Sequence, residues 1–285
     1  MSTVLVTGGT GTTGRRVSAL LRERGTPVRI ATRKPAAGDR EQLRFDWADP
    51  ATYAPVVAGV ERIYLVAPVG VADPARVVEP FLAAALRAGT RRVVLLSSSA
   101  VAEGSAGLGA LNRLVRTSVP EWTVLRPSWF MQNFVGEHAV AAGIRASGEI
   151  ATATGDGKVA FVDAADIAAV AARALLDGVP HNTEHVITGR QALSYAQAAA
   201  TISATTGLSV RHRAISPADL VARLVAIGIP APFATFLADL DEQIRHGAED
   251  RVTSTVRSVT GRPARSFTDF VSAHRDAFTG PPLSG

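Results

Sequence analysis

The stretch TVLVTGGTGTTG, residues 3–14, decides the fold. It opens with a short apolar, β-branched run that predicts a buried strand, and a glycine-rich turn follows directly. Gly9, Gly11 and Gly14 satisfy the G-x-G-x-x-G spacing, and apolar residues at helical spacing begin at Val17. Glycines permit a tight turn, and backbone N–H groups together with a helix N-terminus attract a pyrophosphate. The sequence therefore predicts a dinucleotide-binding strand–turn–helix unit.

The end of the second predicted strand distinguishes between the two nicotinamide cofactors. NAD binders place an Asp or Glu about 20 residues after the glycine turn, where it bonds the ribose 2′-hydroxyl. This chain has Arg33 and Lys34 there instead. A guanidinium can bind a 2′-phosphate with two hydrogen bonds, which favours NADP(H) as the cofactor. The alternative interpretation is a solvated basic loop.

Other strand ends complete the predicted cofactor site. Asp46 and Trp47 follow the third predicted strand, where such folds contact the adenine, and Ala67 and Pro68 follow the fourth. Ligands of open parallel sheets bind at the carboxyl ends of the strands. The candidate cofactor-binding residues are Gly8, Thr10, Gly11, Thr12, Thr13, Gly14, Arg33, Lys34, Asp46, Trp47, Ala67 and Pro68.

Short apolar runs alternate with amphipathic segments through the first half of the chain. This rhythm predicts an α/β protein with a Rossmann-type doubly wound parallel sheet and a smaller C-terminal substrate lobe. We assign residues 1–135 to an NADP(H)-binding Rossmann core. Residues 136–285 are assigned mainly to the lobe that lines the substrate pocket, with some elements returning to the core sheet. Strands are predicted at 3–7, 27–32, 43–45, 60–67, 92–97 and 122–125, and helices at 14–24, 50–57, 74–87 and 108–117.

The second half lacks glycine-rich turns and has a different pattern. One helix is expected over 130–146, and a terminal helix over 268–277. Residues 230–233 are expected to form a surface loop, with a flexible lid as the alternative. Further strands are predicted at 158–162, 184–188 and 211–214, and helices at 163–176, 194–207 and 216–227.

Composition narrows the class of protein. The chain has 285 residues, a formal net charge of +5 and no cysteine. The lack of cysteine excludes disulfides, zinc–thiolate sites and a cysteine nucleophile, and no metal site is expected. The basic residues are scattered, whereas a nucleic-acid site would gather them on one face. No apolar run approaches the roughly 20 residues of a membrane span. We therefore expect a cytoplasmic protein with a small-molecule substrate, no nucleic acid partner and no membrane.

Three segments resemble a known family. Residues 7–14, TGGTGTTG, resemble the TGxTGxxG pattern of atypical short-chain dehydrogenases. Residues 122–134, WTVLRPSWFMQNF, resemble the TxLRPxxFMxN signature of the NmrA-like family, and residues 157–168 and 260–270 also fit it. Within that family the chain is most similar to the ergot-alkaloid-type branch of agroclavine and festuclavine dehydrogenase-like proteins. The resemblance covers nearly the whole chain.

The resemblance implies a substrate pocket between the nicotinamide and the C-terminal lobe. Ser128, Trp129, Phe130 and Asn133 would border that pocket by motif position. Core packing is an equal alternative for Trp129 and Phe130. For Met131, in the same motif, core packing is the better interpretation. Asp166, near the start of a predicted helix, is interpreted as a helix cap rather than a catalytic residue.

The expected general acid is missing. Main-branch short-chain dehydrogenases carry Tyr-x-x-x-Lys on the helix after the fifth strand, but residues 108–117 contain neither tyrosine nor lysine. Ser97 and Ser98 remain as weak catalytic candidates. General acid help is worth about 10²–10⁴ in rate, so an unactivated ketone is a poor substrate without it. An iminium ion is already cationic, and hydride addition neutralises it. The sequence therefore predicts an NADPH-dependent oxidoreductase acting on a small activated acceptor, and a cyclic imine or iminium is the favoured acceptor.

Two alternatives remain open at this point. A quinone is also electrophilic enough to accept hydride with water as the proton source. NmrA-like proteins further include NADP(H)-sensing regulators without turnover, and the missing acid suits that role as well. The oligomeric state is expected to be a monomer or a homodimer.

Overall fold

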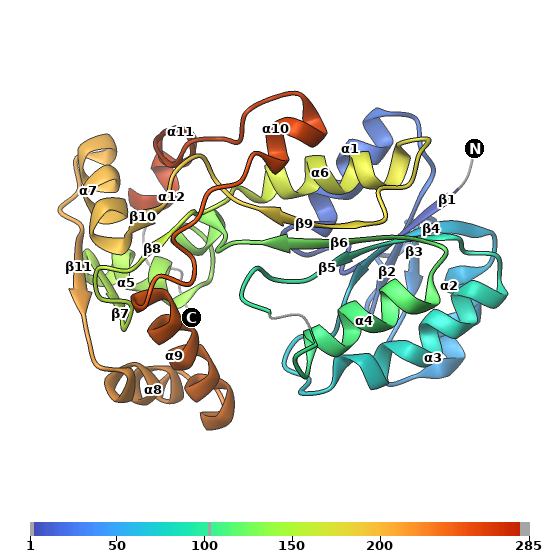
Figure 1. Cartoon of the computed structure of the whole chain (residues 1–285), viewed down its shortest axis with the longest axis horizontal. Helices are drawn as coiled ribbons and strands as arrows, with labels where there is room; N and C mark the ends of the chain where they lie inside the picture. The colour runs from blue at the N-terminus through green and yellow to red at the C-terminus, as the bar shows by residue number, and fades with distance from the viewer. Residues whose placement is uncertain (1–2, 102–103, 280–285) are drawn as a thin grey trace. The chain divides into compact units, whose positions relative to one another are not determined.

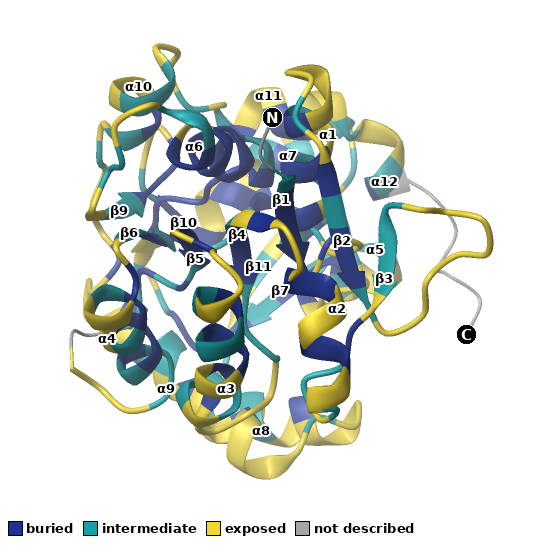
Figure 2. Ribbon diagram, turned by 90° about the vertical axis from the view of Figure 1, so that its right-hand side faces the viewer, coloured by how far each residue is buried: buried dark blue, intermediate teal, exposed yellow. Residues whose placement is uncertain are grey.

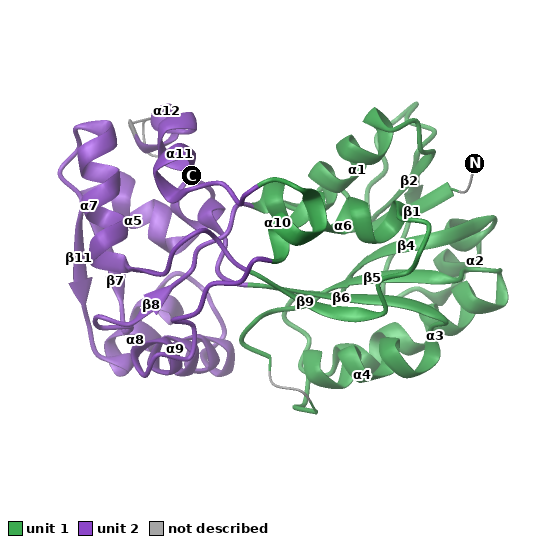
Figure 3. Ribbon diagram, turned by 45° about the horizontal axis from the view of Figure 1, so that its top comes forward, with its two compact units in different colours: residues 1–127, 164–187, 255–262 green, residues 128–163, 188–254, 263–285 purple. Residues whose placement is uncertain are grey.

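The computed structural model describes residues 3–101 and 104–279. The chain divides into two compact units, which Figure 3 distinguishes by colour. Unit 1 comprises Met1–Pro127, Ala164–Ile187 and Thr255–Arg262, and unit 2 comprises Ser128–Asp163, Thr188–Ser254 and Pro263–Gly285. Residues 128–135, placed in the Rossmann core by sequence, lie in unit 2, and two later segments return to unit 1.

Unit 1 contains a seven-stranded sheet in which every pairing is parallel. The strand order is β3-β2-β1-β4-β5-β6-β9. The chain adds strands on one side of β1 and then on its other side, as in a doubly wound Rossmann sheet. The predicted fold class is therefore confirmed. The strands are β1 (Thr3–Thr7), β2 (Val28–Thr32), β3 (Gln42–Arg44), β4 (Val60–Val66), β5 (Arg92–Leu96), β6 (Glu121–Pro127) and β9 (Thr183–Ile187).

Helices cover both faces of this sheet, which explains the continuous apolar runs of its central strands. In β1, Val4 to Val6 are fully buried, and Figure 2 shows the same for the middle of the sheet. Figure 1 shows α1 and α6 on one face and α2, α3 and α4 on the other. The helical elements of unit 1 are α1 (Gly14–Glu23), η1 (Pro50–Thr52), α2 (Tyr53–Val57), α3 (Pro74–Arg87), α4 (Leu108–Ser118), α6 (Ala164–Leu176) and α10 (Thr255–Thr260).

Unit 2 has its own core, built largely from aromatic rings. Phe134, Phe161, Tyr195 and Phe267 contact one another with ring centroids 4.9–5.9 Å apart. Its strands form two small pairs, parallel β7 with β11 and antiparallel β8 with β10. The elements are η2 (Met131–Phe134), α5 (Ala139–Ser147), β7 (Glu149–Thr152), β8 (Lys158–Val159), β10 (Leu193–Ser194), α7 (Tyr195–Thr206), β11 (Arg211–Ala214), α8 (Pro217–Ala226), α9 (Ala231–Arg245), α11 (Phe267–Ala273) and α12 (Arg275–Thr279).

The single helix predicted over 130–146 is wrong. The segment forms a short 3₁₀ helix, η2, and then a separate helix, α5. Val162 donates its N–H to the carbonyl of Trp129 and accepts from the N–H of Met131, both at 2.9 Å. These bonds hold Phe130 in an extended conformation, so the helical conformation begins only at Met131. His138 is also extended and caps α5 through its ring nitrogen.

Three smaller predictions in the second half are also wrong or incomplete. Residues 230–233 are not a loop, because α9 begins at Ala231 with proline in its first turn, where a missing N–H costs nothing. The expected terminal helix is interrupted at His274 and forms α11 and α12. The strand predicted over 158–162 is confirmed only for Lys158–Val159. Strands β7 and β10 and helices α9 and α10 were not predicted.

The close packing at Gly14 generates a stability prediction. A Cβ atom at this position would lie 2.2 Å from the carbonyl oxygen of Gly8, so the backbone would have to shift. We expect Gly14→Ala to destabilise the fold by about 1–3 kcal/mol, the usual cost of overpacking. Chemical denaturation would measure it.

Gly178→Ala is the matched control. A Cβ atom there meets nothing within 4 Å. The same substitution should be neutral or stabilising by up to about 1 kcal/mol, through loss of unfolded-state entropy. Equal stability of both variants would show that the turn has room that the structure does not indicate.

Candidate functional site

The glycine-rich turn presents bare backbone at the carboxyl end of β1. Gly8 has φ +61°, a conformation that L side chains rarely adopt, and the N–H of Gly11 donates to the carbonyl of Gly8 at 2.9 Å. A Cβ on Gly9 would lie 2.6 Å from Cγ2 of Ile30, so this glycine allows the turn to pack on β2. Gly8, Thr10 and Gly11 are exposed. The backbone of the turn is therefore exposed directly before the N-terminus of α1. A phosphate site at a helix N-terminus requires this exposure.

Buried hydroxyl groups support this turn from below. The Thr7 hydroxyl accepts from the N–H of Val66 at 2.7 Å, which ties the end of β1 to the end of β4. The phenol of Tyr64, itself buried, donates to the hydroxyl of Thr13 at 2.9 Å. The Thr13 hydroxyl is thus bonded inside the protein, whereas Thr10 and Thr12 are at least partly accessible to solvent. Among the predicted hydroxyls, these two remain the candidates for contact with a phosphate.

The two predicted cations lie directly beyond β2. Arg33 and Lys34 are exposed, and neither forms an ion pair with a residue that the structure describes. The nearby carboxylates are engaged elsewhere: Glu41 pairs with Arg22, and Asp39 accepts from the side-chain amide of Gln42 at 2.7 Å. The cations are therefore available to an anionic ligand at this strand end.

The other strand ends differ in how far they are open. Trp47 is half-buried in a ring cluster, with its centroid 4.7 Å from Phe45 and 5.3 Å from Phe81. Asp46 accepts from the N–H of Ala48 at 3.0 Å and so shapes the turn after β3. Ala67 and Pro68, after β4, are half-buried.

The serine turn after β5, residues 97–101, has one hydroxyl without a partner. Ser97 is buried, and its Oγ has no hydrogen-bond partner among the described residues. Ser98 Oγ accepts from the N–H of Ala100 at 3.2 Å. An unpartnered buried hydroxyl at the carboxyl end of a central strand is unusual, and a ligand at that strand end would account for it.

The predicted substrate-pocket residues lie in unit 2. Ser128 is buried with an unpartnered Oγ, and Trp129, Phe130 and Asn133 are half-buried. Met131 is 1% exposed, so its interpretation as a core residue is confirmed. These residues belong to one unit and the cofactor candidates to the other.

Each of the three tyrosines is accounted for, and none lies on α4. The Tyr53 phenol donates to the carbonyl of Trp47 at 2.8 Å, and Tyr64 bonds Thr13. Tyr195 belongs to the core of unit 2, where burial and the neighbouring Asp241 carboxylate raise its pKa. Burial also raises the pKa of Tyr64, which makes it a poorer acid still.

The sequence reasoning missed three polar residues of the two units. Arg126, in the LRP segment, bonds the serine turn and Glu184. Asp163, 1% exposed, accepts from Gln132 at 2.9 Å and pairs with Arg265 at 3.0 Å. The pKa of the Asp241 carboxyl is raised to about 6 by burial. No local sequence pattern predicts these contacts, because the two residues of each contact are far apart in the sequence.

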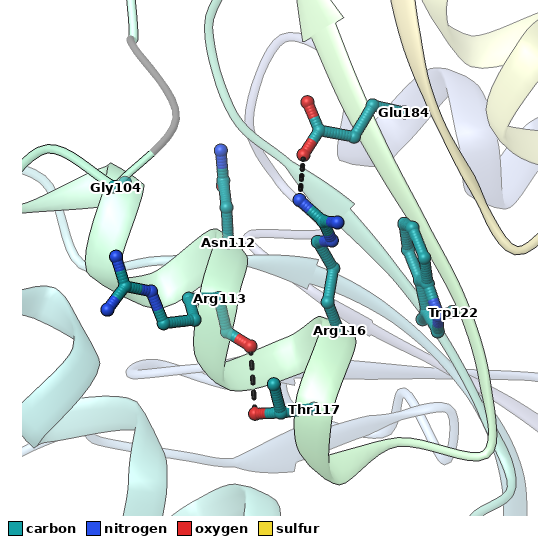
Figure 4. Close-up of a pocket in the computed structure, with 8 residues that line it drawn as sticks. Gly104, Asn112, Arg113, Arg116, Thr117, Trp122 and Glu184 are labelled. Atoms are coloured by element: carbon teal, nitrogen blue, oxygen red, sulfur yellow. Dashed lines mark hydrogen bonds and ion pairs between the residues drawn. The ribbon is translucent and has the colours of Figure 1, made fainter.

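A pocket in unit 1 lies beside α4, and none of the predicted site residues lines it. Its volume is about 270 Å³. Figure 4 shows Arg116 extending from α4 toward Glu184, with which it bonds at 3.2 Å, while its guanidinium lies 5.3 Å from the ring centre of Trp122. The lining residues are Gly104, Gly109, Asn112, Arg113, Arg116, Thr117, Trp122 and Glu184.

Among residues 3–101 and 104–279, no group of three or more His, Cys, Asp or Glu side chains could hold a metal ion. Within the same ranges no helix combines the length and apolarity that crossing a membrane requires.

Comparison with known proteins settles the family. The family model described as NmrA-like matches residues 1–259. The chain belongs to the NmrA-like family. It is 50% identical over 278 residues to the uncharacterized oxidoreductase YesF of Bacillus subtilis, covering 97% of this chain and 96% of the relative. It is 36% identical over 286 residues to the agroclavine dehydrogenase of Claviceps fusiformis, covering 97% and 98%. The predicted family resemblance is confirmed.

A solved structure is similar across the same length. The NADPH-dependent quinone oxidoreductase QOR2 of Escherichia coli, in complex with NADPH, matches with a TM-score of 0.81 and 26% identity. The match covers 95% of this chain and 99% of that protein. The matched region therefore includes residues of both units.

The exposed cations after β2 generate a prediction of cofactor preference. A charge-assisted hydrogen bond contributes about 1.5–3 kcal/mol, so one contact from Arg33 should favour NADPH over NADH by roughly tenfold to a hundredfold. Arg33→Asp should erase or reverse that ratio, as measured by fluorescence titration of both cofactors.

Arg87→Asp controls for the change of net charge. Arg87 is exposed at the end of α3, which leads toward the amino end of β5, at the opposite edge of the sheet from Arg33. This variant should keep the preference. Equal dissociation constants for NADPH and NADH in the unmodified protein would contradict the assignment of Arg33.

Proposed function

We propose that this chain transfers hydride from NADPH to a small activated acceptor, and that the preferred acceptor is a cyclic imine in its cationic iminium form. The chain is an NADP(H)-dependent oxidoreductase of the NmrA-like family. Relatives named as an oxidoreductase and as agroclavine dehydrogenase support this coarser statement, as does the NADPH complex of the similar quinone oxidoreductase.

The residues of unit 1 fit the dinucleotide. NADPH supplies the hydride when bound. The exposed backbone of Gly8 and Gly11 and the N-terminus of α1 would hold the pyrophosphate, because no side chain covers them and the dipole favours an anion. Arg33 and Lys34 would bind the 2′-phosphate. The unpartnered Ser97 hydroxyl is the candidate contact near the end of β5.

The proposal of an iminium acceptor rests on the hydrogen bonds and positions of the tyrosines. Tyr53 and Tyr64 bond other groups of unit 1, and α4 presents Asn112, Arg113 and Arg116 instead of a tyrosine and a lysine. Hydride addition to C=N⁺ forms a C–H bond, and the π electron pair moves to nitrogen. The product is a neutral amine and NADP⁺, so no protein proton is consumed. An acceptor of this kind suits a site without a phenol acid.

Orientation is then the main task of the pocket residues. Positioning of two reactants can supply several kcal/mol of barrier lowering, about 7–11 in well-ordered cases. We assign Trp129 and Phe130, both half-buried, to the face of a flat acceptor. An aromatic face also attracts a cation by about 0.5–2 kcal/mol, which favours the charged iminium over a neutral ring of the same shape.

Quinone reduction is the second candidate. The structural similarity to a quinone oxidoreductase over 95% of this chain favours it. A quinone can take its proton from water after hydride transfer, so it also needs no phenol acid. Comparing turnover of iminium ions with turnover of quinones under the same conditions decides between the two.

The proposed chemistry predicts a pH profile without a protein acid. The rate on a permanently charged iminium should be flat through neutral pH, and a neutral imine should report only its own protonation. Simple ketones should be reduced far more slowly, by about the 10²–10⁴ that general acid help is worth. Ser97→Ala should keep measurable turnover, since its hydroxyl is not required as a proton donor.

Asp241→Asn is the control for a hidden proton donor. Asp241 is the group to exclude, because its pKa of about 6 would protonate it in the acidic part of the profile. If turnover of the charged iminium rose below that pH and the rise vanished in Asp241→Asn, the reaction would use an acid and the proposal would be wrong. Efficient reduction of ketones would have the same consequence.

A further inference from the structure

Arg126 of β6 donates hydrogen bonds to the carbonyl groups of the serine turn. Its Nε donates to the carbonyl of Ser98 at 3.4 Å, and its Nη2 donates to the carbonyls of Ser99, at 3.4 Å, and Val101. The guanidinium is a rigid planar fork of five donors, so it can bind several acceptors in one fixed arrangement. One side chain therefore binds three carbonyls within four consecutive residues.

The far side of the same guanidinium is held by a carboxylate. Arg126 Nη1 bonds Oε2 of Glu184 on β9 at 2.9 Å, and both side chains are about four-fifths buried, with 18% and 20% exposure. Arg116 of α4 bonds the other oxygen of Glu184 at 3.2 Å. The carboxylate thus fixes Arg126 from the next strand of the sheet, and the charge of Arg126 is compensated where water is scarce.

The backbone N–H groups of the serine turn are also fixed by β6. Ser97 donates to the carbonyl of Leu125 at 2.7 Å, and Ser99 donates to that of Pro127 at 2.9 Å. These bonds extend the parallel pairing of β5 and β6 beyond the end of β5. The turn is therefore bonded on its N–H side by the β6 backbone and on its carbonyl side by a β6 side chain.

We propose that Arg126 is a positioning residue for hydride transfer. It holds the serine turn at the carboxyl end of β5 and so sets where Ser97, with its unpartnered hydroxyl, faces the nicotinamide or the acceptor. This inference rests on the proposed function, because the turn matters to catalysis only if hydride transfer occurs at this end of the sheet. Arg126 acts through the turn and touches neither reactant.

Arg126→Ala and Arg116→Ala make a matched pair for the test. Each removes one arginine from Glu184, but only the first removes the contacts to the turn. Misplacement by about 1 Å can cost a hundredfold in rate, so Arg126→Ala should lower kcat on the iminium substrate by about tenfold to a hundredfold. The dissociation constant of NADPH should stay near that of the unmodified protein, since its phosphate contacts are elsewhere. Arg126→Lys should recover part of kcat, and Arg116→Ala should keep it.

Hydrogen exchange of the peptide containing residues 97–101 gives a readout besides activity. Exchange should accelerate in Arg126→Ala and not in Arg116→Ala. Equal losses of kcat in the two variants, or unchanged kcat and exchange in Arg126→Ala, would overturn the proposal. So would a proportional loss of NADPH affinity and kcat, which indicates general disorder.

Failure of the proposed function would look different. In that case the unmodified protein reduces no acceptor, yet exchange of the serine turn and the fluorescence of bound NADPH still respond to Arg126→Ala alone. Unchanged exchange and fluorescence in that variant would overturn the positioning role itself.

Discussion

The rest of unit 1 depends on the close approach between the start of α1 and the turn that precedes it. At Gly14 there is no space for a Cβ, which would lie 2.2 Å from the Gly8 carbonyl oxygen. Because α1 begins this close to β1, its N-terminus lies next to the exposed turn. The same approach places Thr13 over Tyr64, whose phenol is thereby used for support. A constraint of packing thus produces a phosphate-binding geometry.

Burial of the sheet on both faces places the remaining ligand groups. Parallel strands covered by helices on each side end at one common edge, and the loops that follow them share it. Arg33, Trp47, Pro68 and Ser97 follow four different strands and belong to that edge for this reason alone. At one point of this edge, the Arg126 side chain adds hydrogen bonds to the carbonyls of the turn after β5, whose N–H groups already bond the β6 backbone.

Sequence reasoning succeeded where structure is local. The first half of the chain was predictable because each strand, turn and helix has its own short pattern, and Met131 was recognisable as core. The predicted helix over 130–146 is wrong at its start because Val162, which bonds Trp129 and Met131 through the backbone, is distant in sequence, and it is interrupted before the extended His138. The bond between Arg126 and Glu184 spans 58 residues, and the ion pair of Asp163 with Arg265 spans 102. No window of sequence contains both partners of such pairs.

The fate of Tyr64 links the fold to the chemistry. A phenol buried beneath the glycine turn, bonded to Thr13 and raised in pKa by burial, is unsuited to proton transfer. The helix after β5 offers no replacement. Its polar residues are one amide, two arginines and the hydroxyls of Thr117 and Ser118 at its C-terminal end, and it carries no tyrosine or lysine. With no acid to stabilise a developing alkoxide, selectivity must come from the acceptor's own electrophilicity and from how accurately it is held. The fixed serine turn of unit 1 and the half-buried rings of Trp129 and Phe130 in unit 2 are suited to holding an acceptor of this kind.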